Sequence, residues 1–563
     1  MKSKLASLIV MLLITTNVAA CSNSKNESAS SGAGNSSPET SSTEQADPAL
    51  DDWAPFSKYK EQIVFTTGRQ VVTDNRLPAG DDLENNLFSR HVESKINVKV
   101  KNLWEVEANE NTFNQKLSLS LSSGNLPDAL LVDRKMFRQL LDADMIADLT
   151  QAYNKTASPY IKDVINSYGT LLDEVTVDGK IMAIPGANIG GGHNILWVRK
   201  DWLDKLGLQP PKTIDDIIAV AKAFIEKDPG GNGAGKTIGI PSNSNLVGHY
   251  NDGLILDPIF NLYGAFPTQW IKDTSGNIVY GSVQPEMKTA LAKLAEMYKD
   301  GLIDEQFAIR KVEDSHALLA SGKAGLYFGP WWAAYFPLQD SVKNNPKADW
   351  KPYNAPLDAD GKYNTYKQDM LAPMLVVRKG FEHPEAIVKV LNVELQATRG
   401  SDDPDGLKVS KEMQDKGINW AVMPLPIHMD YNDALVRSYN QLKEAIDTGS
   451  DAKVSSDFKS VYPNYVKNQA NPGADAGAWA DATARIDGQA LTFNDQVVFH
   501  DVAFHGVTPS METKWANLEK LENQTLLKIV MGEIPVDDFD QFVEEWKRLG
   551  GDEITKEVND SKR

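Results

Sequence analysis

The segment from Gly230 to Thr237 carries the strongest chemical signature in the sequence. Its residues, GGNGAGKT, fit the phosphate-binding pattern G-x-x-x-x-G-K-[ST] at every specified position. In nucleotide-binding proteins a strand delivers such a glycine turn, its backbone amides hold phosphate, and a helix begins directly behind it. The flanking elements therefore decide whether this segment binds a nucleotide.

The elements around this segment occur in the reverse order. A capping box begins a helix at Thr213, and apolar residues recur at helical spacing through Glu226. Asp228-Pro229 ends this helix, and residues 237–241 are expected to form a short strand. Because a loop from helix to strand cannot place Lys236 at the start of a helix, the sequence argues against nucleotide binding.

The N-terminus indicates export and lipidation. Two lysines precede an apolar run, residues 8–18, that is too short to span a bilayer, which predicts a signal peptide over residues 1–20. Cys21 follows small residues, as in the lipobox of bacterial lipoproteins, where the cysteine is diacylated and becomes the new N-terminus. It is the only cysteine in the chain, so it has no partner for a disulfide. The alternative is an ordinary secretory signal followed by a chance cysteine.

Residues 21–52 are nearly all small or polar and offer too little apolar surface to offset the entropy of ordering. We expect a flexible tether with a reach of roughly 30 Å, carrying the lipidated Cys21 at its start. No later apolar run reaches membrane-spanning length. The prediction is therefore a protein held by its lipid at the extracellular face of the cell membrane.

The composition predicts a large acidic α/β protein. A net charge of -19 argues against nucleic acid as a partner, and 41% hydrophobic residues in 563 can build more than one core, so two lobes are expected. Strand-like segments at residues 63–65, 98–100 and 129–132 alternate with helix-like ones. Further helices are expected between Pro285 and Gly301 and over residues 539–549.

Six phrases carry a family resemblance. They are GNLPDALLVD (124–133), VDGKIMAIP (177–185), LWVRKDWLDKLGLQPPKTIDD (196–216), MYKDGLID (297–304), SGKAGLYFGPWW (321–332) and EEWKRLGGDEITKEVN (544–559). In these phrases the chain resembles the extracellular solute-binding lipoproteins (family 1) of carbohydrate ABC importers, of the large type found in Gram-positive bacteria. The resemblance implies a two-lobed, type II periplasmic-binding-protein-like α/β fold, with its lobes joined by crossing hinge segments.

The resemblance also implies how the chain divides and what it does. Lobe 1 would contain residues 61–184 and 369–431, and lobe 2 would contain residues 185–367 and 432–563. The protein would be a monomer that captures an oligosaccharide outside the cell and delivers it to ABC permease subunits, without a cofactor. A receptor that reports sugar occupancy to a sensor kinase would use the same cleft.

The glycine-rich segment has a second interpretation through this resemblance. Relatives often carry an EF-hand-like calcium loop with a DPDGNGKKDTIG-like pattern between this helix and strand, and here the stretch is DPGGNGAGKTIG. Asp228 and Asn232 keep ligand side chains. Gly230 deletes one carboxylate, however, and Lys236 replaces another with a cation. We therefore expect a degenerate loop that is kept as a turn, and no metal.

Sugar sites pair aromatic platforms with side chains that donate or accept hydrogen bonds. Trp331 and Trp332 follow a strand expected over residues 324–328, and the resemblance implies that a tryptophan there stacks on a sugar ring. Because adjacent side chains diverge, we expect one of them to face the ligand and the other to pack. Trp270 and Trp420 are further aromatic candidates.

The polar candidates are Arg69, Asp128, Asn188, His193 and Asn194, and weaker candidates are Trp104 and Asp369. Arg69 follows the first strand, at the carboxyl end where open α/β sheets bind ligands, unless it is simply an exposed arginine. Asp128, before the third strand, is either a ligand acceptor or a turn residue. Residues 188–194 contain three glycines, which permit hinging and close backbone approach or form a merely flexible loop.

The competing hypothesis is an extracellular polysaccharide hydrolase or lyase, because such sites also combine aromatics with carboxylates. A glycosidase needs two carboxylates at a defined separation, and a pair can hide among 77 acidic residues. The chain has no H-E-x-x-H or G-x-S-x-G motif. His500 and His505 lack further metal-like partners and are expected to be ordinary histidines. We therefore predict a binding protein without catalytic residues.

Overall fold

The computed structural model describes residues 52–72, 75–107, 110–189, 192–248, 253–399 and 403–561. The predicted signal peptide, Cys21 and the tether up to residue 51 lie outside the described residues, as do Gly190 and Gly191. Within the described part, no helix combines the length and the apolar character needed to cross a bilayer.

A five-stranded sheet in the order β2-β1-β3-β13-β6 forms the centre of the first lobe. Strands β1 (Ile63–Val71), β2 (Val98–Glu107) and β3 (Ala129–Val132) run parallel and confirm the three predicted strands. Strand β13 (Leu371–Val377) pairs antiparallel with β3 and with β6 (Ile184–Ala187). The chain therefore returns to this sheet after it has built most of the second lobe.

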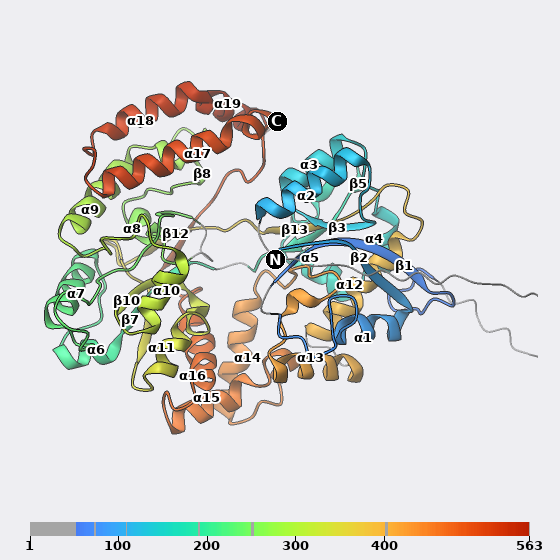
Figure 1. Cartoon of the computed structure of the whole chain (residues 1–563), viewed down its shortest axis with the longest axis horizontal. Helices are drawn as coiled ribbons and strands as arrows, with labels where there is room; N and C mark the ends of the chain where they lie inside the picture. The colour runs from blue at the N-terminus through green and yellow to red at the C-terminus, as the bar shows by residue number, and fades with distance from the viewer. Residues whose placement is uncertain are drawn as a thin grey trace, which may run out of the picture. The chain divides into compact units, whose positions relative to one another are not determined.

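Helices cover both faces of this sheet. They are α1 (Leu87–Ile96), α2 (Glu110–Ser123), α3 (Arg134–Asp142), α4 (Thr150–Thr156), α5 (Pro159–Ser167), α12 (Pro384–Thr398) and α13 (Pro404–Lys416). Figure 1 shows α2 and α3 on one side of the strands and α1, α12 and α13 on the other. The main core draws its buried residues from Tyr59 to Ala187 and from Leu371 to Met429. The core thus continues to Ala187, past the expected bound at residue 184, and the lobe bounds stay a proposal.

Smaller sheets build the second lobe. Strand β7 (Asn194–Arg199) lies between β10 (Leu326–Pro330) and β11 (Trp350–Tyr353) and is antiparallel to both. Two further pairs are the hairpin β8 (Trp270–Lys272) with β9 (Ile278–Tyr280) and the parallel pair β12 (Tyr363–Tyr366) with β14 (Val497–His500). In the first lobe, β4 (Thr176–Val177) and β5 (Lys180–Ile181) form a short hairpin.

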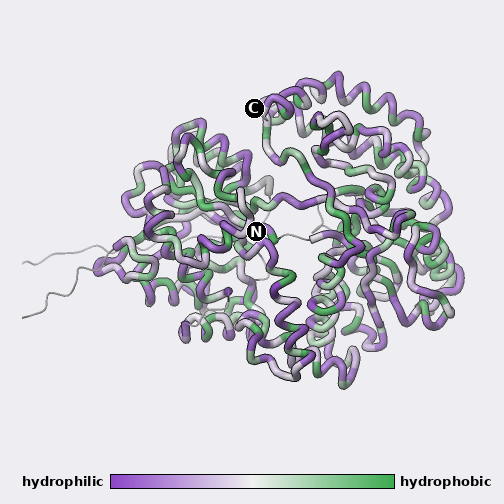
Figure 2. The backbone as a smooth tube through the Cα atoms, turned by 180° about the vertical axis from the view of Figure 1, so that it is seen from behind, coloured by the Kyte–Doolittle hydropathy of each residue, from purple (hydrophilic) through white to green (hydrophobic). Residues whose placement is uncertain are grey.

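Most helices of the described residues lie in the part of the chain expected to form the second lobe. They are α6 (Lys200–Leu206), α7 (Ile214–Lys227), α8 (Asp257–Leu262), α9 (Glu286–Lys299), α10 (Val312–Ala320), α11 (Leu338–Asn344), α14 (Ala434–Thr448), α15 (Val461–Ala470), α16 (Ala476–Ala482), α17 (Pro509–Val530), α18 (Asp538–Trp546) and α19 (Asp552–Asp560). Their apolar faces fill two cores built with β7 and β10 and a smaller core between α14 and α15. Figure 2 shows apolar and hydrophilic residues alternating along the C-terminal helices, as one buried face per helix requires.

Several local predictions can be compared with these elements. The capping box at Thr213 is present and begins α7, and α9 begins directly after Pro285, so both predictions are confirmed. Helix α18 ends at Trp546 and continues as a π-helical turn over Lys547–Gly551, in which Gly550 (φ +132°) breaks the helical path, close to the predicted end at residue 549. The strand predicted over residues 237–241 is wrong. Its two isolated bridges go to different partners, so no continuous ladder forms.

Candidate functional site

A cavity of about 470 Å³ lies at the carboxyl ends of β1 and β3, wholly within the first lobe. The two strands are parallel, so their carboxyl ends meet at one edge of the sheet, where open α/β sheets bind ligands. The lining includes residues 67–70, 113–114, 131–133, 420–421 and 424–428. Segments far apart in the sequence therefore meet at one edge because β1, β3 and the returning chain share one sheet.

The segment NWAVMPLPIH, residues 419–428, forms one wall of this cavity. Several of its apolar side chains are buried in the first-lobe cores, whereas Trp420 remains 45% exposed. Asn419 accepts a hydrogen bond at 2.9 Å from the backbone N–H of residue 421 and so caps a short 3-10 turn. Pro424 and Pro426 restrict the backbone that follows. The sequence thus holds a half-exposed tryptophan on a stiff segment.

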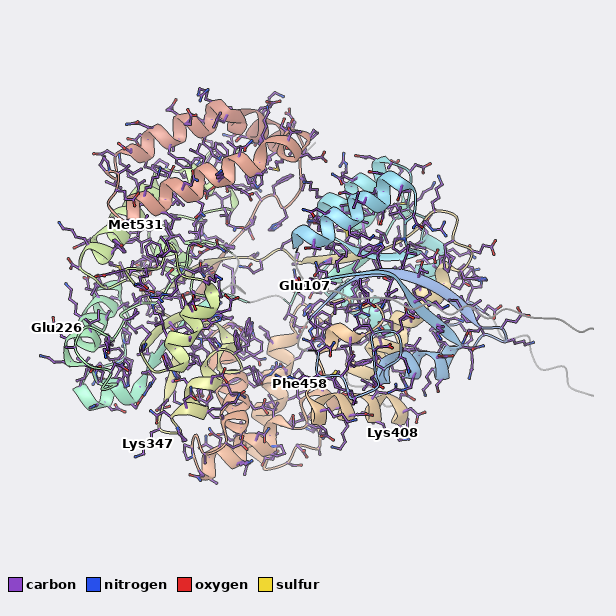
Figure 3. The ribbon with its side chains drawn as sticks, in the orientation of Figure 1. Glu107, Glu226, Lys347, Lys408, Phe458 and Met531 are labelled. Atoms are coloured by element: carbon purple, nitrogen blue, oxygen red, sulfur yellow. The ribbon has the colours of Figure 1, made fainter. Side chains whose placement is uncertain are left out.

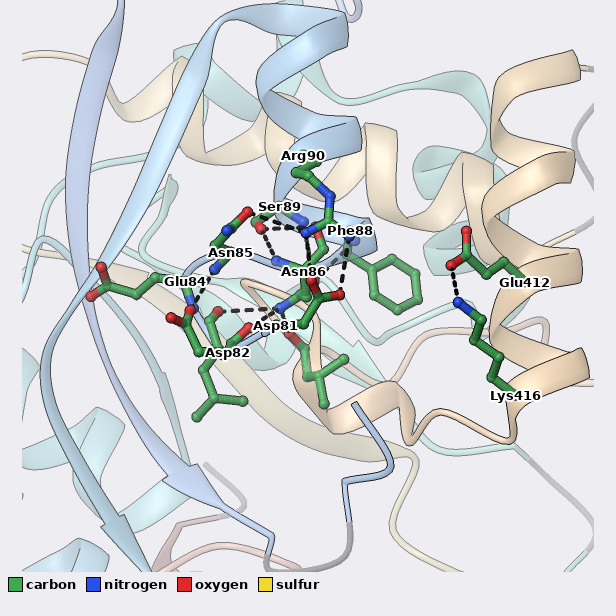
Figure 4. Close-up of polar contacts among 12 residues, drawn as sticks. Asp81, Asp82, Glu84, Asn85, Asn86, Phe88, Ser89, Arg90, Glu412 and Lys416 are labelled. Carbon is green, nitrogen blue, oxygen red and sulfur yellow. Dashed lines mark hydrogen bonds and ion pairs between the residues drawn. The ribbon is translucent and has the colours of Figure 1, made fainter. Parts of the chain in front are cut away.

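Two elements of the lobe fix this segment from its N-terminal side. The Nη2 atom of Arg69, on β1, donates a hydrogen bond to the carbonyl oxygen of Ala421. Asn86 caps α1 through Phe88 and Ser89, as Figure 4 shows. The Nδ2 atom of the same Asn86 donates to the carbonyl oxygen of residue 422 at 3.2 Å. The position of Trp420 therefore depends on β1 and α1.

Two other elements fix the C-terminal side of the segment. On α12, Oε1 of Glu394 accepts a hydrogen bond from the backbone N–H of Leu425 at 3.1 Å. Ala187, at the end of β6, donates its N–H to the carbonyl oxygen of His428 at 2.7 Å. The carbonyl oxygen of Ala187 lies 2.9 Å from Nδ1 of the same histidine. The cavity wall is thus joined to the strand that leads out of the lobe.

Charged side chains are few in the cavity lining. Arg69 and Asp133 are the charged members, and Oδ1 of Asp133 accepts from the N–H of Met136 at 2.7 Å, which caps α3. Burial lowers the pKa of His428 below its usual value, so the ring is neutral at pH 7 and presents one acceptor nitrogen. The remaining surface is dominated by apolar side chains, among them Trp420. Such a lining suits a ligand with flat C–H faces and a few polar groups.

The structure brings two of the predicted first-lobe residues, Arg69 and Trp420, into this cavity. It places Asp128 at the amino end of β3, at the opposite edge of the sheet. There Oδ2 of Asp128 accepts hydrogen bonds from the N–H and hydroxyl of Thr66, and Oδ1 pairs with Arg378 at 2.7 Å. These long-range contacts tie Asp128 to β1 and to the residue after β13, and ligand contact by Asp128 stays a prediction. We therefore leave Asp128 out of the proposed site.

Asn188 and Asp369 lie where the chain crosses between the lobes. The Nδ2 atom of Asn188 donates to the carbonyl oxygen of Asp369 at 3.0 Å, and its carbonyl oxygen accepts from the hydroxyl of Tyr168 at 2.7 Å. The Asp369 carboxylate pairs with Arg134 at 2.9 Å. Trp104 is 9% exposed and packs against Phe113 in the first-lobe core. These residues hold the crossing and the core together, and ligand contact by them stays a prediction.

The paired tryptophans differ in exposure. Trp331 is 7% exposed, and the guanidinium carbon of Arg485 lies 4.9 Å from its ring centroid. The same guanidinium lies 4.6 Å from the ring of Phe458, which Figure 3 labels. Trp332 is partly buried and packs against the core that contains Trp331. Strand β10 continues through Pro330, two residues beyond the strand expected over residues 324–328. Of the two rings, Trp332 keeps more exposed surface.

The other second-lobe predictions lie in packed surroundings. Trp270 is 5% exposed and contacts Tyr280 and Trp515, with ring centroids 5.1 and 6.1 Å away. His193 is 1% exposed, with Nε2 3.2 Å from the side-chain oxygen of Asn354. Asn194 begins β7 and is 4% exposed. Their burial gives each of them a packing role, and ligand binding by them stays untested.

The glycine-rich loop is stabilised by its own hydrogen bonds. Oδ1 of Asp228 accepts from the N–H of Asn232 at 2.9 Å and from the hydroxyl of Thr237 at 2.6 Å, and Oδ2 accepts from the N–H of Gly233 at 2.7 Å. A Cβ atom at Gly230 would lie 2.6 Å from the ring of Trp202, so a carboxylate has no room there. In the described part of the chain, no group of three His, Cys, Asp or Glu side chains could hold a metal.

Sequence reasoning missed most of the cavity lining. Phe113, Pro373 and the segment 424–428 reach the cavity only because α2, β13 and the returning chain meet at one sheet edge. The sequence NWAVMPLPIH did contain a usable signal. Its two prolines predict a stiff segment, and a tryptophan directly before such a segment keeps its ring in a fixed place.

A comparison with protein families decides the kinship of the chain. A model described as "Bacterial extracellular solute-binding protein" matches residues 92–379, about half of the chain. The chain belongs to this family of bacterial extracellular solute-binding proteins. The match runs from within α1 to just past the end of β13 and so includes four of the five strands of the first-lobe sheet, all except β1.

Two curated relatives of this solute-binding protein are described as binding proteins. It is 23% identical over 482 residues to the polygalacturonan/rhamnogalacturonan-binding protein YtcQ of Bacillus subtilis, a match that covers 84% of this chain and 87% of the relative. It is 28% identical over 240 residues to the fructooligosaccharide ABC transporter substrate-binding protein FusA of Streptococcus pneumoniae, covering 39% of this chain and 42% of that one.

Solved structures show the fold of the solute-binding protein. A FusA EF-hand mutant from S. pneumoniae in complex with fructo-nystose aligns with a TM-score of 0.61 at 16% identity, over 89% of this chain and 98% of that one. The alginate-binding protein AlgQ2 without calcium ion aligns with a TM-score of 0.58 at 17% identity, over 90% of this chain and 99% of that one. The chain thus has the two-lobed α/β fold of these binding proteins.

Proposed function

We propose that this solute-binding protein captures an oligosaccharide outside the cell and delivers it intact to an ABC-type permease. The observation that carries the proposal is the cavity at the carboxyl edge of the first-lobe sheet, where Trp420 is 45% exposed on a stiff segment. A ring of that size can stack on the C–H face of a sugar. Relatives described as oligosaccharide- or polysaccharide-binding proteins support the same ligand class.

The proposed site combines both lobes. Trp420 supplies the platform and Arg69 the charge on the first lobe, and Trp332 is the aromatic candidate on the second. Asn188 ties two crossing segments together, so we place it in the hinge rather than in the site. Closure of the lobes would be driven by tighter ligand binding in the closed state. The protein would act as a monomer, anchored through a lipid on Cys21, with no cofactor and no chemical step.

Binding without cleavage can be tested directly on residues 50–563, which form one compact unit. We expect a matching oligosaccharide to raise the unfolding free energy by RT ln(1 + [L]/Kd), about 2.7 kcal/mol at a hundredfold excess over Kd. Product analysis should return the sugar unchanged. Accumulating cleavage products would instead support the hydrolase or lyase hypothesis and contradict the proposal.

A further inference from the structure

Arg69 is a buried cation in the cavity lining. It is 4% exposed, and its Nη2 atom donates to the carbonyl oxygen of Ala421. Its Nε and Nη1 atoms are buried and have no hydrogen-bond partner among the described residues. Burial lowers the pKa of this guanidinium, yet arginine remains protonated at pH 7. Since burying an unpaired charge is costly, an arginine in this state calls for a functional explanation.

Neighbouring carboxyls do not offset this charge at neutral pH. Glu394 acts on Arg69 electrostatically, but burial raises the pKa of Glu394 to about 8, so the carboxyl is mostly protonated at pH 7. Its Oε1 atom accepts from the N–H of Leu425, and its Oε2 atom has no partner. Glu105 on β2 is exposed, accepts from Asn102 at 2.7 Å and is screened by solvent.

The other polar groups of the lining leave the positive charge in place. The Asp133 carboxylate is engaged by the N-terminus of α3, and His428 is neutral at pH 7. A cavity with apolar walls strengthens the field of such a charge, because little solvent screens it there. A protein of net charge -19 therefore buries a guanidinium in the lining of its first-lobe cavity, where Asp133, the one acidic side chain of the lining, caps α3.

We propose that the ligand is an acidic oligosaccharide, with carboxylates on its sugar rings, and that Arg69 is the residue that selects it. This inference rests on the proposed function and names the ligand class for the same cavity. A guanidinium forms strong charge-assisted hydrogen bonds to carboxylates, and a neutral sugar would leave its charge unpaired. Trp420, from the same lining, would stack on the ring that bears the carboxylate.

The test is calorimetry on residues 50–563 with matched ligand pairs. The probes are trimers of galacturonate, mannuronate and glucuronate, each beside its methyl ester, which has the same ring and lacks the charge. We expect at least one acid to bind tenfold or more tightly than its ester. Its affinity should fall between 50 and 300 mM NaCl, while the affinity of the ester stays constant.

Two variants assign this selectivity to Arg69. Arg69→Met removes the charge at similar volume and should bring the acid-to-ester ratio close to one, with urea unfolding of the variant as the control for intact folding. Arg69→Lys keeps the charge and should retain most of the ratio. If the Met variant does not fold, the acid-to-ester ratio of the wild type, its salt dependence and the ratio of the Lys variant decide whether Arg69 selects the acid.

The outcomes separate the two proposals. Equal or tighter binding of the esters, or of neutral oligosaccharides, by the wild-type protein overturns the acidic ligand class and leaves the proposed function standing. An unchanged acid-to-ester ratio in a folded Arg69→Met variant overturns the role of Arg69. Failure of every acidic and neutral oligosaccharide to bind counts against the proposed function and removes the inference with it.

Discussion

Trp420 in the first lobe and Trp270 and Trp331 in the second lobe differ strongly in exposure. In the first lobe, Trp420 is 45% exposed in the lining of a cavity at the carboxyl edge of a sheet. In the second lobe, Trp270 and Trp331 are 5% and 7% exposed and packed into cores. The sequence favours Trp331 and Trp332 as sugar platforms over Trp270 and Trp420, whereas the structure leaves Trp420 the more exposed ring. The difference teaches that location relative to a sheet edge, rather than residue type, decides which aromatic side chain is available to a ligand.

The largest expected effect tests the packing role of Trp270. Trp270→Ala should lower the free energy of unfolding by about 3–5 kcal/mol, because a large buried ring is lost from contacts with Tyr280 and Trp515. Trp420→Ala is the matched control and should change it by less than about 1 kcal/mol, since its ring is half-exposed. Urea unfolding of both variants measures the two free energies of unfolding. Equal losses would contradict the different packing of the two rings.

The second effect concerns ligand affinity, for which Trp420 should matter more than the buried tryptophans. Trp420→Ala should weaken oligosaccharide binding by about 2 kcal/mol, roughly thirtyfold, because an aromatic platform is removed. Trp420→Phe should recover part of the loss, and Trp331→Ala, if it folds, should bind normally, since Arg485 covers that ring. Calorimetry with the same ligand compares the three variants. Normal affinity in Trp420→Ala would place the ligand elsewhere.

Glu394 in the first lobe and Glu522 in the second are buried carboxyls whose titrations should differ. Burial raises the pKa of Glu394 to about 8 in the first lobe and that of Glu522 to about 7 in the second, where it accepts from Tyr280 at 2.9 Å. Below the unfolded pKa, near 4.5, both states are protonated. Above it the folded state holds protons that the unfolded state has lost, so stability falls as pH rises toward each folded pKa, by at most about 1.4 kcal/mol per unit per group.

This pH dependence separates the lobes between pH 7 and 8, where Glu394 accounts for most of the expected loss. Glu394→Gln should flatten the unfolding free energy in that window, and Glu522→Gln should flatten it mainly between pH 5 and 7. Denaturant unfolding at unit pH intervals is the measurement. Identical slopes for the wild type and Glu394→Gln between pH 7 and 8 would show that this carboxyl is already ionised in the folded protein.

The smallest expected effect is the response to calcium. The carboxylate of Asp228 is occupied by hydrogen bonds within its own loop, and Gly230 has no room for a side chain beside Trp202. Calorimetry and thermal unfolding at millimolar calcium should therefore show neither a binding isotherm nor a shift in Tm. Lys236→Asp, which restores one carboxylate, is the comparison variant. A clear isotherm in the wild-type protein would contradict the prediction of a degenerate loop.

Local signals predicted elements well, because they depend on neighbours in the sequence. The capping box of α7, the start of α9 after Pro285 and the three parallel strands all follow from short patterns. The site was harder to predict, because it depends on which end of a strand a residue occupies. Arg69 lies in the carboxyl-terminal half of β1 and reaches the cavity, whereas Asp128 precedes β3 and lies at the far edge.

Burial was the other property that could not be predicted from the sequence. Trp270 and Trp420 have the same chemistry, and only the tertiary partners of Trp270 remove it from the surface. The short strand expected over residues 237–241 does not form, because its two bridges pair with separate distant segments. Pairings between distant segments decide both outcomes, and no local pattern encodes them.

A crystal structure of residues 50–563 with an oligosaccharide that binds in calorimetry tests the central claim most directly. The account predicts an uncleaved sugar in the first-lobe cavity, with one ring about 4 Å from the face of Trp420 and close to Arg69. An intact sugar held elsewhere, without contact to the segment 419–428, would contradict this site. A hydrolysed sugar in the same cavity would contradict the proposal of binding without chemistry.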